Sequence, residues 1–262
     1  MLLKTQNSRN NIIFMESIVN AIITSTNKIF ENQARIANNI TNISTPGFKS
    51  ELELKILLPS QKDQNSQEDN FLYKQYKNKN QGTLRRTNQP LDCAIIDKND
   101  WFVIKIDPKT IAYTKNGHFK INSNRQLTVQ NHPVLGEDGE IFIPKNENIV
   151  ISSDGYINII KNNVLQHKVA QFKLKNFDIN DLTYKTNGLY LLNKNNKLNH
   201  TNHKNVSNIK LVSGILEDSN VNLEENMVEM ISNARKFDMQ IKILSMYNEN
   251  TQAASRFLNL NY

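Results

Sequence analysis

At 262 residues, the chain is long enough for one large domain or two small ones. A hydrophobic content of 38% and a mean hydropathy of -0.56 are low for one packed globule, so we expect parts that are extended, solvated or dependent on partners. The net charge of +7 would suit a nucleic-acid surface, but the lysines are scattered among Asn and acidic residues without a dense basic block, which disfavours that class.

No sequence pattern indicates a disulfide, a metal site or a membrane span. Cys93 is the single cysteine, and the close pair His200 and His203 lies in an Asn- and Lys-rich segment that is typical of a solvated loop. No stretch approaches the ~20 apolar residues of a transmembrane helix. The apolar run Ile12-Ile13-Phe14 is followed by polar residues and by no small-residue cleavage site, so we expect no cleaved signal peptide.

The first regular pattern is a helical one. Residues 1–14 show no period and are expected to be unstructured. From residue 15 onward, positions spaced alternately by four and three residues predict a helix over about 16–41. These positions are Ile18, Ile22, Ser25, Ile29, Asn32, Ile36, Ile40 and Ile43. The polar members of this seam weaken helix pairing but are able to fix its register and partner.

A turn follows the first helix. Pro46-Gly47 fits the centre of a type II turn, and the residue before a proline is pushed out of the helical region, so the helix has to end by Thr45. We expect Phe48 to dock on a neighbouring molecule. Residues 46–80 are predicted to be a linker, in which residues 60–80 form a polar loop or a segment that becomes ordered only in an assembly.

The period changes to that of β-strands over residues 81–212. Short β-branched and aromatic runs alternate with turn signals every 8–15 residues, which predicts a mainly antiparallel β domain. Hairpins are expected at Asn116-Gly117 and at Asp154-Gly155. Cys93 and Trp101 are interpreted as core residues rather than as a nucleophile and a ligand platform. Residues 193–208 are predicted to be a polar loop.

The closing segment, residues 213–262, predicts a second long helix over 216–260. Its apolar seam consists of Leu223, Met227, Met230, Ala234, Phe237, Ile241 and Leu244. The spacing is that of a coiled coil, and such a seam needs a partner helix, which only the N-terminal segment offers. The predicted fold is therefore α+β, in which the N- and C-terminal helices pair as a coiled-coil stalk and the central β domain is mainly antiparallel.

Several blocks of sequence resemble the flagellar rod and hook proteins. The blocks are Ile36-Ala37-Asn38-Asn39-Ile40-Thr41-Asn42-Ile43-Ser44-Thr45-Pro46-Gly47-Phe48-Lys49, Gly82-Thr83-Leu84, Pro90-Leu91-Asp92, Tyr113-Thr114-Lys115-Asn116-Gly117, and Gly214 to Asn222 with the helix after it. Within that family, residues 233–240 and 248–250 are most similar to proximal-rod members, with distal-rod members as the alternative.

The resemblance implies a structural subunit of the flagellar basal-body rod in the periplasm, without a cofactor. It implies self-association, contacts with other rod subunits, and export through the flagellar type III apparatus. The assembly interface is then expected at Ile36, Ala37, Asn38, Asn39, Ile40, Asn42, Pro46, Gly47, Phe48, Ser219, Asn220, Val221, Met227, Met230, Ile231, Ala234, Phe237, Ile241 and Leu244. A binder of nucleic acid or another anionic surface is the competing class. An enzyme is disfavoured because no phosphate loop, metal spacing or nucleophile elbow is present.

Overall fold

The computed structural model describes residues 2–57, 71–145, 147–161, 164–186, 188–193 and 208–259. These residues form an α+β structure with a helix at each end of the chain and antiparallel strands in its middle, as predicted. The chain divides into two compact units. One, the helical unit, comprises residues 1–40 and 222–262, and the other, the β body, comprises residues 41–221.

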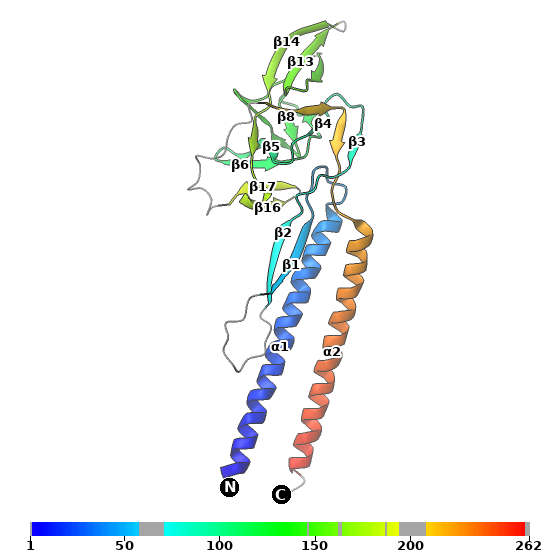
Figure 1. The fold of residues 1–262 in the computed structure, drawn as a ribbon. Helices are drawn as coiled ribbons and strands as arrows, with labels where there is room; N and C mark the ends of the chain where they lie inside the picture. The colour runs from blue at the N-terminus through cyan, green and yellow to red at the C-terminus, as the bar shows by residue number, and fades with distance from the viewer. Residues whose placement is uncertain are drawn as a thin grey trace. The chain divides into compact units, whose positions relative to one another are not determined.

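The helical unit consists of α1 (Leu2–Thr41) and α2 (Leu223–Asn259). Neither helix contains Gly or Pro, so nothing in their sequences interrupts the backbone hydrogen-bond ladder. The side chain of Asn222 caps α2 by accepting a hydrogen bond from the backbone N–H of Glu225 at 3.3 Å. Figure 1 shows the two helices side by side, running in opposite directions.

Both helix boundaries differ from the prediction. The stretch 2–14, expected to be unstructured, belongs to α1, because no residue in it ends a helix even though its apolar period is weak. The second helix begins at Leu223 instead of Leu216, because Ile215–Glu217 forms strand β19, paired with β3 (Leu84–Arg86). The β domain therefore extends past residue 212.

The largest sheet of the β body has five strands, all antiparallel. Its order is β15 (Leu174–Asn176), β5 (Asp100–Asp107), β6 (Thr110–Thr114), β17 (Leu189–Leu192) and β16 (Leu182–Thr186). A 3-10 turn, η1 (Ile179–Asp181), precedes β16. Strand β5 is buried from Asp100 to Ile104, and residues 101–104 form a continuous apolar run.

The β body also contains smaller sheets, whose strands are antiparallel too. They are β12 (Asn148–Ile151), β13 (Tyr156–Lys161) and β14 (Val164–Gln171); β7 (Lys120–Ile121), β8 (Leu127–Val129) and β9 (His132–Pro133); β10 (Leu135–Gly136) and β11 (Gly139–Glu140); β18 (Leu211–Ser213) and β4 (Cys93–Ile95); and β1 (Glu51–Leu57) and β2 (Phe71–Lys77).

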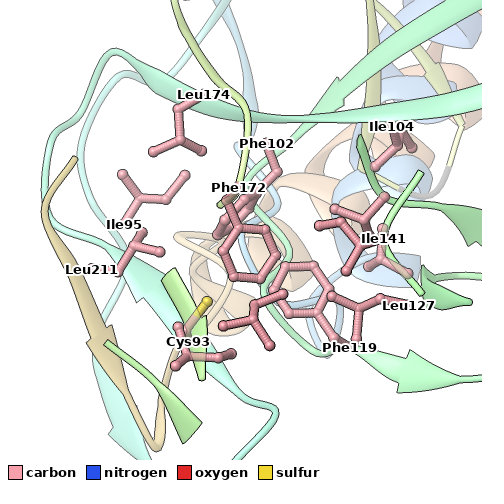
Figure 2. Close-up of a cluster of buried hydrophobic side chains, with 14 of the residues drawn as sticks. Cys93, Ile95, Phe102, Ile104, Phe119, Leu127, Ile141, Phe172, Leu174 and Leu211 are labelled. Atoms are coloured by element: carbon pink, nitrogen blue, oxygen red, sulfur yellow. The ribbon is translucent and has the colours of Figure 1, made fainter. Parts of the chain in front are cut away.

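Three phenylalanine rings form the centre of the main apolar core (Figure 2). The rings of Phe119 and Phe172 stack with their centroids 5.0 Å apart, and Phe102 meets both of them edge-on. Cys93 is fully buried in this core, and Trp101 is buried in a neighbouring cluster that includes Tyr190, so both are core residues as predicted. Aromatic pairs of this geometry add about 0.5–1.5 kcal/mol each beyond their buried area.

The strand predictions were partly wrong. The predicted linker 46–80 contains the hairpin β1–β2, although residues 58–70 lie outside the described residues. No hairpin forms at Asn116-Gly117, because β6 is already paired with β5 and β17 and the Gly117 carbonyl accepts a hydrogen bond from Cys93 N–H. The hairpin at Asp154-Gly155 joins β12 to β13 and is confirmed. Of the predicted loop 193–208, residues 194–207 lie outside the described residues.

Candidate assembly interface

The helices α1 and α2 contact each other through several polar side chains and one aromatic pair. Asn39 Nδ2 donates to Asn226 Oδ1 at 3.2 Å, Arg35 pairs with Glu229, Thr26 Oγ1 donates to Gln240 Oε1 at 2.8 Å, Gln240 Nε2 donates to Ser25 Oγ, and the rings of Phe30 and Phe237 lie 5.4 Å apart. Residue numbers fall along α2 as they rise along α1 in these contacts. The register is therefore antiparallel.

The inward face of α2 is not the predicted apolar seam. Asn226 and Asn233 are buried on it, whereas Met227, Ala234 and Ile241 are exposed. The observed inward face and the predicted apolar seam are offset by one residue in every heptad. Each exposed apolar residue of the seam directly follows a polar residue that faces α1. Phe237 and Leu244 belong to both faces and are partly buried.

Polar residues recur on both helices with the spacing of a heptad. We call Asn226, Asn233 and Gln240 on α2, with Ser25, Asn32 and Asn39 on α1, the polar ladder. The register places these residues opposite one another in three rungs, and the outer two rungs are hydrogen-bonded. The predicted seam already contained the α1 members Ser25 and Asn32, but no apolar period indicates the α2 members.

Apolar side chains of α2 are consequently turned to solvent. We call Met227, Ile231, Ala234 and Ile241 the α2 ridge, because their spacing places them along one stripe of the helix. Met227 is 49% exposed, Ile231 55% and Ile241 48%. Met230, Val228, Met239, Ile243 and Met246 add further exposed apolar surface around the helix. Contiguous apolar surface on a monomer commonly marks an interaction site.

The predicted interface residues of α1 are divided between exposed and buried positions. Ile36 and Asn39 are buried, Ala37 is exposed, and Asn38 and Ile40 are partly buried. The buried pair has an intramolecular role in the chain, so an interface on this stretch has Ala37 as its most accessible member.

The turn that follows α1 is built into the β body. Gly47 has φ +70°, and a Cβ added there would lie 2.5 Å from the backbone carbon of Lys115, so this position requires glycine. The Gly47 N–H donates to the carbonyl of Glu217 at 2.7 Å. Asn42 Nδ2 donates to the Tyr184 hydroxyl at 3.3 Å, and Pro46 is partly buried.

Phe48 packs within its own chain rather than projecting toward a neighbour. It is 0% exposed, and its ring meets the ring of Tyr184 in an edge-on arrangement at 5.7 Å. The Phe48 carbonyl accepts a hydrogen bond from the backbone N–H of Asn220 at 3.3 Å. The family-like sequence block therefore locks the start of the β body to residues near its end.

A buried ion pair reinforces this junction. Lys49 Nζ lies 2.5 Å from Glu217 Oε1, and both side chains are almost fully buried. Lys49 also donates to the carbonyl of Asn80 at 2.9 Å, and Glu217 accepts from the Gly82 N–H at 3.0 Å. Removing one partner of such a pair typically costs about 3–5 kcal/mol. The sequence analysis did not predict this pair, and the only signal for it was that each residue lies inside a family-like block.

Asn220 joins the same junction through its side-chain amide. Its Oδ1 accepts from the Ser50 N–H at 2.7 Å, and its Nδ2 donates to the carbonyl of Asn80 at 2.8 Å. The Ser219 hydroxyl accepts from the Val221 N–H at 3.3 Å, and both residues are partly buried. We call Lys49, Glu217 and Asn220, with the backbone groups that they bind, the clasp. It connects three segments that are distant in sequence.

Lys115 adds a second buried cation beside the clasp. Burial lowers its pKa to about 8, and the nearby Glu217 carboxylate opposes this shift. Its Nζ donates to the carbonyl of Asp97 at 2.6 Å and lies 5.3 Å from the centre of the Trp101 ring.

The described residues offer no assembled catalytic or metal site. They contain no group of three or more His, Cys, Asp or Glu side chains that could hold a metal ion. Burial raises the pKa of the Cys93 thiol, which makes it a poor nucleophile. Asp92 and His118 form a hydrogen-bonded pair at 2.7 Å without a nucleophile that completes a triad in the described ranges. None of the described helices combines the length and apolar character of a membrane span.

Comparison with known proteins gives consistent matches along the chain. The family described as Flagellar hook protein FlgE/F/G D1 domain matches residues 95–159, and the family described as Flagellar basal body rod FlgEFG protein C-terminal matches residues 212–257. The chain is 42% identical over 241 residues to the flagellar basal-body rod protein FlgF of Buchnera aphidicola subsp. Schizaphis graminum, covering 89% of this chain and 94% of that protein.

More distant relatives also match most of the chain. FlgF of Salmonella typhimurium is 30% identical over 253 residues, which cover 94% of this chain and 100% of the relative. The flagellar basal-body rod protein FlgG of Buchnera aphidicola subsp. Baizongia pistaciae is 27% identical over 248 residues, covering 86% of this chain and 93% of the relative.

Proposed function

The chain belongs to the family of flagellar basal-body rod and hook proteins and is a structural subunit of the basal-body rod; we propose that it lies in the proximal rod and joins other rod subunits through α1 and α2. The greater similarity to FlgF than to FlgG supports the proximal position. The exposed α2 ridge is the observation that supports assembly through these helices.

A rod requires subunits with two different contact surfaces. Such a tube grows by heterologous contacts that do not close on themselves, so each subunit presents one surface to the next and receives another. The α2 ridge and the exposed apolar residues of α1, Ile23 and Phe30, lie on the helical unit and provide apolar surface of this kind. Burying one such side chain contributes about 1.5–3 kcal/mol. The two helices then pair as a coiled coil within the assembly, with neighbouring helices covering the ridge.

The remaining expectations follow from this assignment. We propose that the rod subunit reaches the periplasm through the flagellar type III export apparatus. A helical unit that buries amides and exposes methionines has little stability of its own. Helices of this kind order fully only against neighbours, which suppresses polymerisation before export.

The experiment compares two triple variants in flagellated cells. One changes the ridge, Met227→Gln, Ile231→Gln and Ile241→Gln. The matched control changes Ile96, Ile111 and Phe142 of the β body to Gln, because these are exposed to a similar extent, 49%, 48% and 54%. Basal bodies are purified, stripped of membrane and filament, and their peptides are quantified by mass spectrometry.

We expect the unchanged chain and the control to remain in the basal bodies. The ridge variant should be depleted by about tenfold or more, since every 1.4 kcal/mol of lost contact free energy is tenfold in occupancy. Retention of the ridge variant at the unchanged level would contradict assembly through the ridge. Absence of the unchanged chain from intact basal bodies, with the chain abundant in the soluble fraction, would contradict the position in the rod.

A further inference from the structure

The helix α2 carries two faces that are each able to pack on α1. The observed inward face contains Asn226, Asn233 and Gln240, and the adjacent face replaces each of them with the next residue, Met227, Ala234 or Ile241. The partly buried Leu223, Phe237 and Leu244 are shared by both faces, and Met230, which is 39% exposed, completes the adjacent face. A rotation of α2 by about half of the 100° between neighbouring residues exchanges one face for the other.

Hydrophobic burial alone would favour the other rotation. The alternative face is apolar at every one of its seven positions, and burying it would remove Met227 and Ile241 from water. The observed face instead buries Asn226 and Asn233, which are 8% and 2% exposed. A specific interaction therefore has to hold the polar face inward.

The polar ladder provides that interaction at its two outer rungs. Asn39 Nδ2 donates to Asn226 Oδ1, and Gln240 donates to Ser25 Oγ while accepting from Thr26 Oγ1. Rotation of α2 toward its apolar face would break these bonds and leave the α1 amides facing methyl groups. The Arg35–Glu229 ion pair supports the same orientation.

The middle rung shows that the ladder orients the helices at a cost. Asn32 Oδ1 accepts hydrogen bonds from the Arg35 guanidinium, at 3.0 Å from Nε and 2.8 Å from Nη2. Asn233, opposite Asn32, has its Nδ2 buried without a hydrogen-bond partner in the described part of the chain. A buried amide without an acceptor is unfavourable, so the rotation that places it inward is set by the other rungs.

We propose that the polar ladder sets the rotation of α2 about its axis, and thereby determines that the ridge Met227, Ile231, Ala234 and Ile241 faces outward. The ladder thus decides which face of the helix is available to a partner. This property belongs to the single chain and holds whatever molecule the ridge binds.

The test measures thiol reactivity on the full-length monomer. A Cys93→Ala background removes the natural cysteine, and Ala234→Cys reports on the ridge. Met239→Cys serves as the reference, because position 239 is 61% exposed and remains outward after the rotation. The ladder is removed from α1 by Ser25→Leu, Asn32→Leu and Asn39→Leu. The matched control places Leu at Asn20, Thr24 and Asn27, which are exposed on the opposite face of α1.

With the ladder intact, the thiols at 234 and 239 should react with a maleimide at similar rates. Removing the ladder should slow labelling at 234 by about tenfold relative to 239, because the rotation buries it, and the control should leave the ratio unchanged. An unchanged ratio in the folded ladder variant, or the same slowing in the control, overturns the proposal. If the triple variant does not fold, the double variant Ser25→Leu and Asn32→Leu keeps the Asn39–Asn226 bond and has to show slowing in the same direction.

Discussion

The β body and the helical unit use polar and apolar side chains in opposite ways. In the β body, Phe102, Phe119 and Phe172 are buried, and the buried charges Lys49 and Glu217 are fully paired. The helical unit instead buries amides and leaves methionine and isoleucine side chains in solvent. A unit whose apolar groups point inward is stable alone, whereas a unit whose apolar groups point outward gains its stability from partners.

The largest change in stability is expected from breaking the buried ion pair between Lys49 and Glu217 in the β body. Glu217→Gln leaves Lys49 buried without a counter-charge and should destabilise the β body by about 3–5 kcal/mol. The measurement is urea unfolding followed by the fluorescence of Trp101, the only tryptophan, which is buried in the β body. The neighbouring change Asp218→Asn removes an exposed partner of Arg85 and should cost about 0–1 kcal/mol. Equal losses in both variants would contradict the importance of burial at the clasp.

In the helical unit, replacing a buried polar residue is expected to increase stability, in contrast to the loss expected in the β body. Asn233→Leu removes an amide whose Nδ2 has no acceptor in the described structure and should stabilise α2 by about 1–3 kcal/mol. Amide hydrogen exchange of α2 measures this gain, and the exposed change Asn250→Leu is the control. Faster exchange in Asn233→Leu would indicate that the amide makes a stabilising interaction after all.

The stability of the β body is expected to depend on pH through the buried Lys115. The folded-state pKa of Lys115 is lowered to about 8 from an ordinary 10.5, so the unfolded state binds more protons between these values. Stability should therefore rise with pH, by about 1–2 kcal/mol from pH 8 to 9.5. The measurement requires a Cys93→Ala background. Burial raises the pKa of the Cys93 thiol in the folded state, so the thiol ionises first in the unfolded state, and this lowers the folding stability at pH values above the ordinary thiol pKa of 9.0. Lys115→Met should abolish most of the rise, and an unchanged slope in this variant would contradict the assignment to Lys115.

The smallest effect is expected on the ridge of the isolated chain. Ile241→Gln exchanges a side chain that is already 48% exposed, so monomer stability should change by less than about 0.5 kcal/mol. Thermal unfolding followed by circular dichroism at the helix band tests this. A loss above about 1 kcal/mol would mean that Ile241 is needed inside the chain, and it would no longer belong to an assembly surface.

The sequence allowed the two helices and the antiparallel β character of the middle of the chain to be predicted, because these patterns are local. The hairpin β1–β2 was missed although Glu51–Leu57 alternates polar and apolar residues, since a polar run follows it. The type II turn at Pro46-Gly47 was placed correctly as a turn, but the burial of Phe48 depends on Tyr184, far away in sequence. No local pattern reveals such a partner.

The candidate interface was predictable only in part for the same reason. The heptad spacing of the sequence identifies which residues share a face of α2. Two faces that are offset by one residue have the same spacing, so the spacing alone does not tell which of them packs on α1. Two hydrogen bonds decide between these faces, one that Ser25 accepts from Gln240 and one that Asn39 donates to Asn226, and each joins residues about two hundred positions apart. The clasp pair Lys49 and Glu217 has the same long separation. Interactions of this kind emerge only from the folded arrangement.

Hydrogen–deuterium exchange on the purified monomer tests the contrast between the two units most directly. We expect amides of β5 and β6 to exchange only through global unfolding, while those of α2 exchange at least about a hundredfold faster. Equal protection of α2 and β5 in the monomer would contradict this difference in stability. The helical unit would then be stable without partners, and its exposed ridge would no longer explain why this chain assembles.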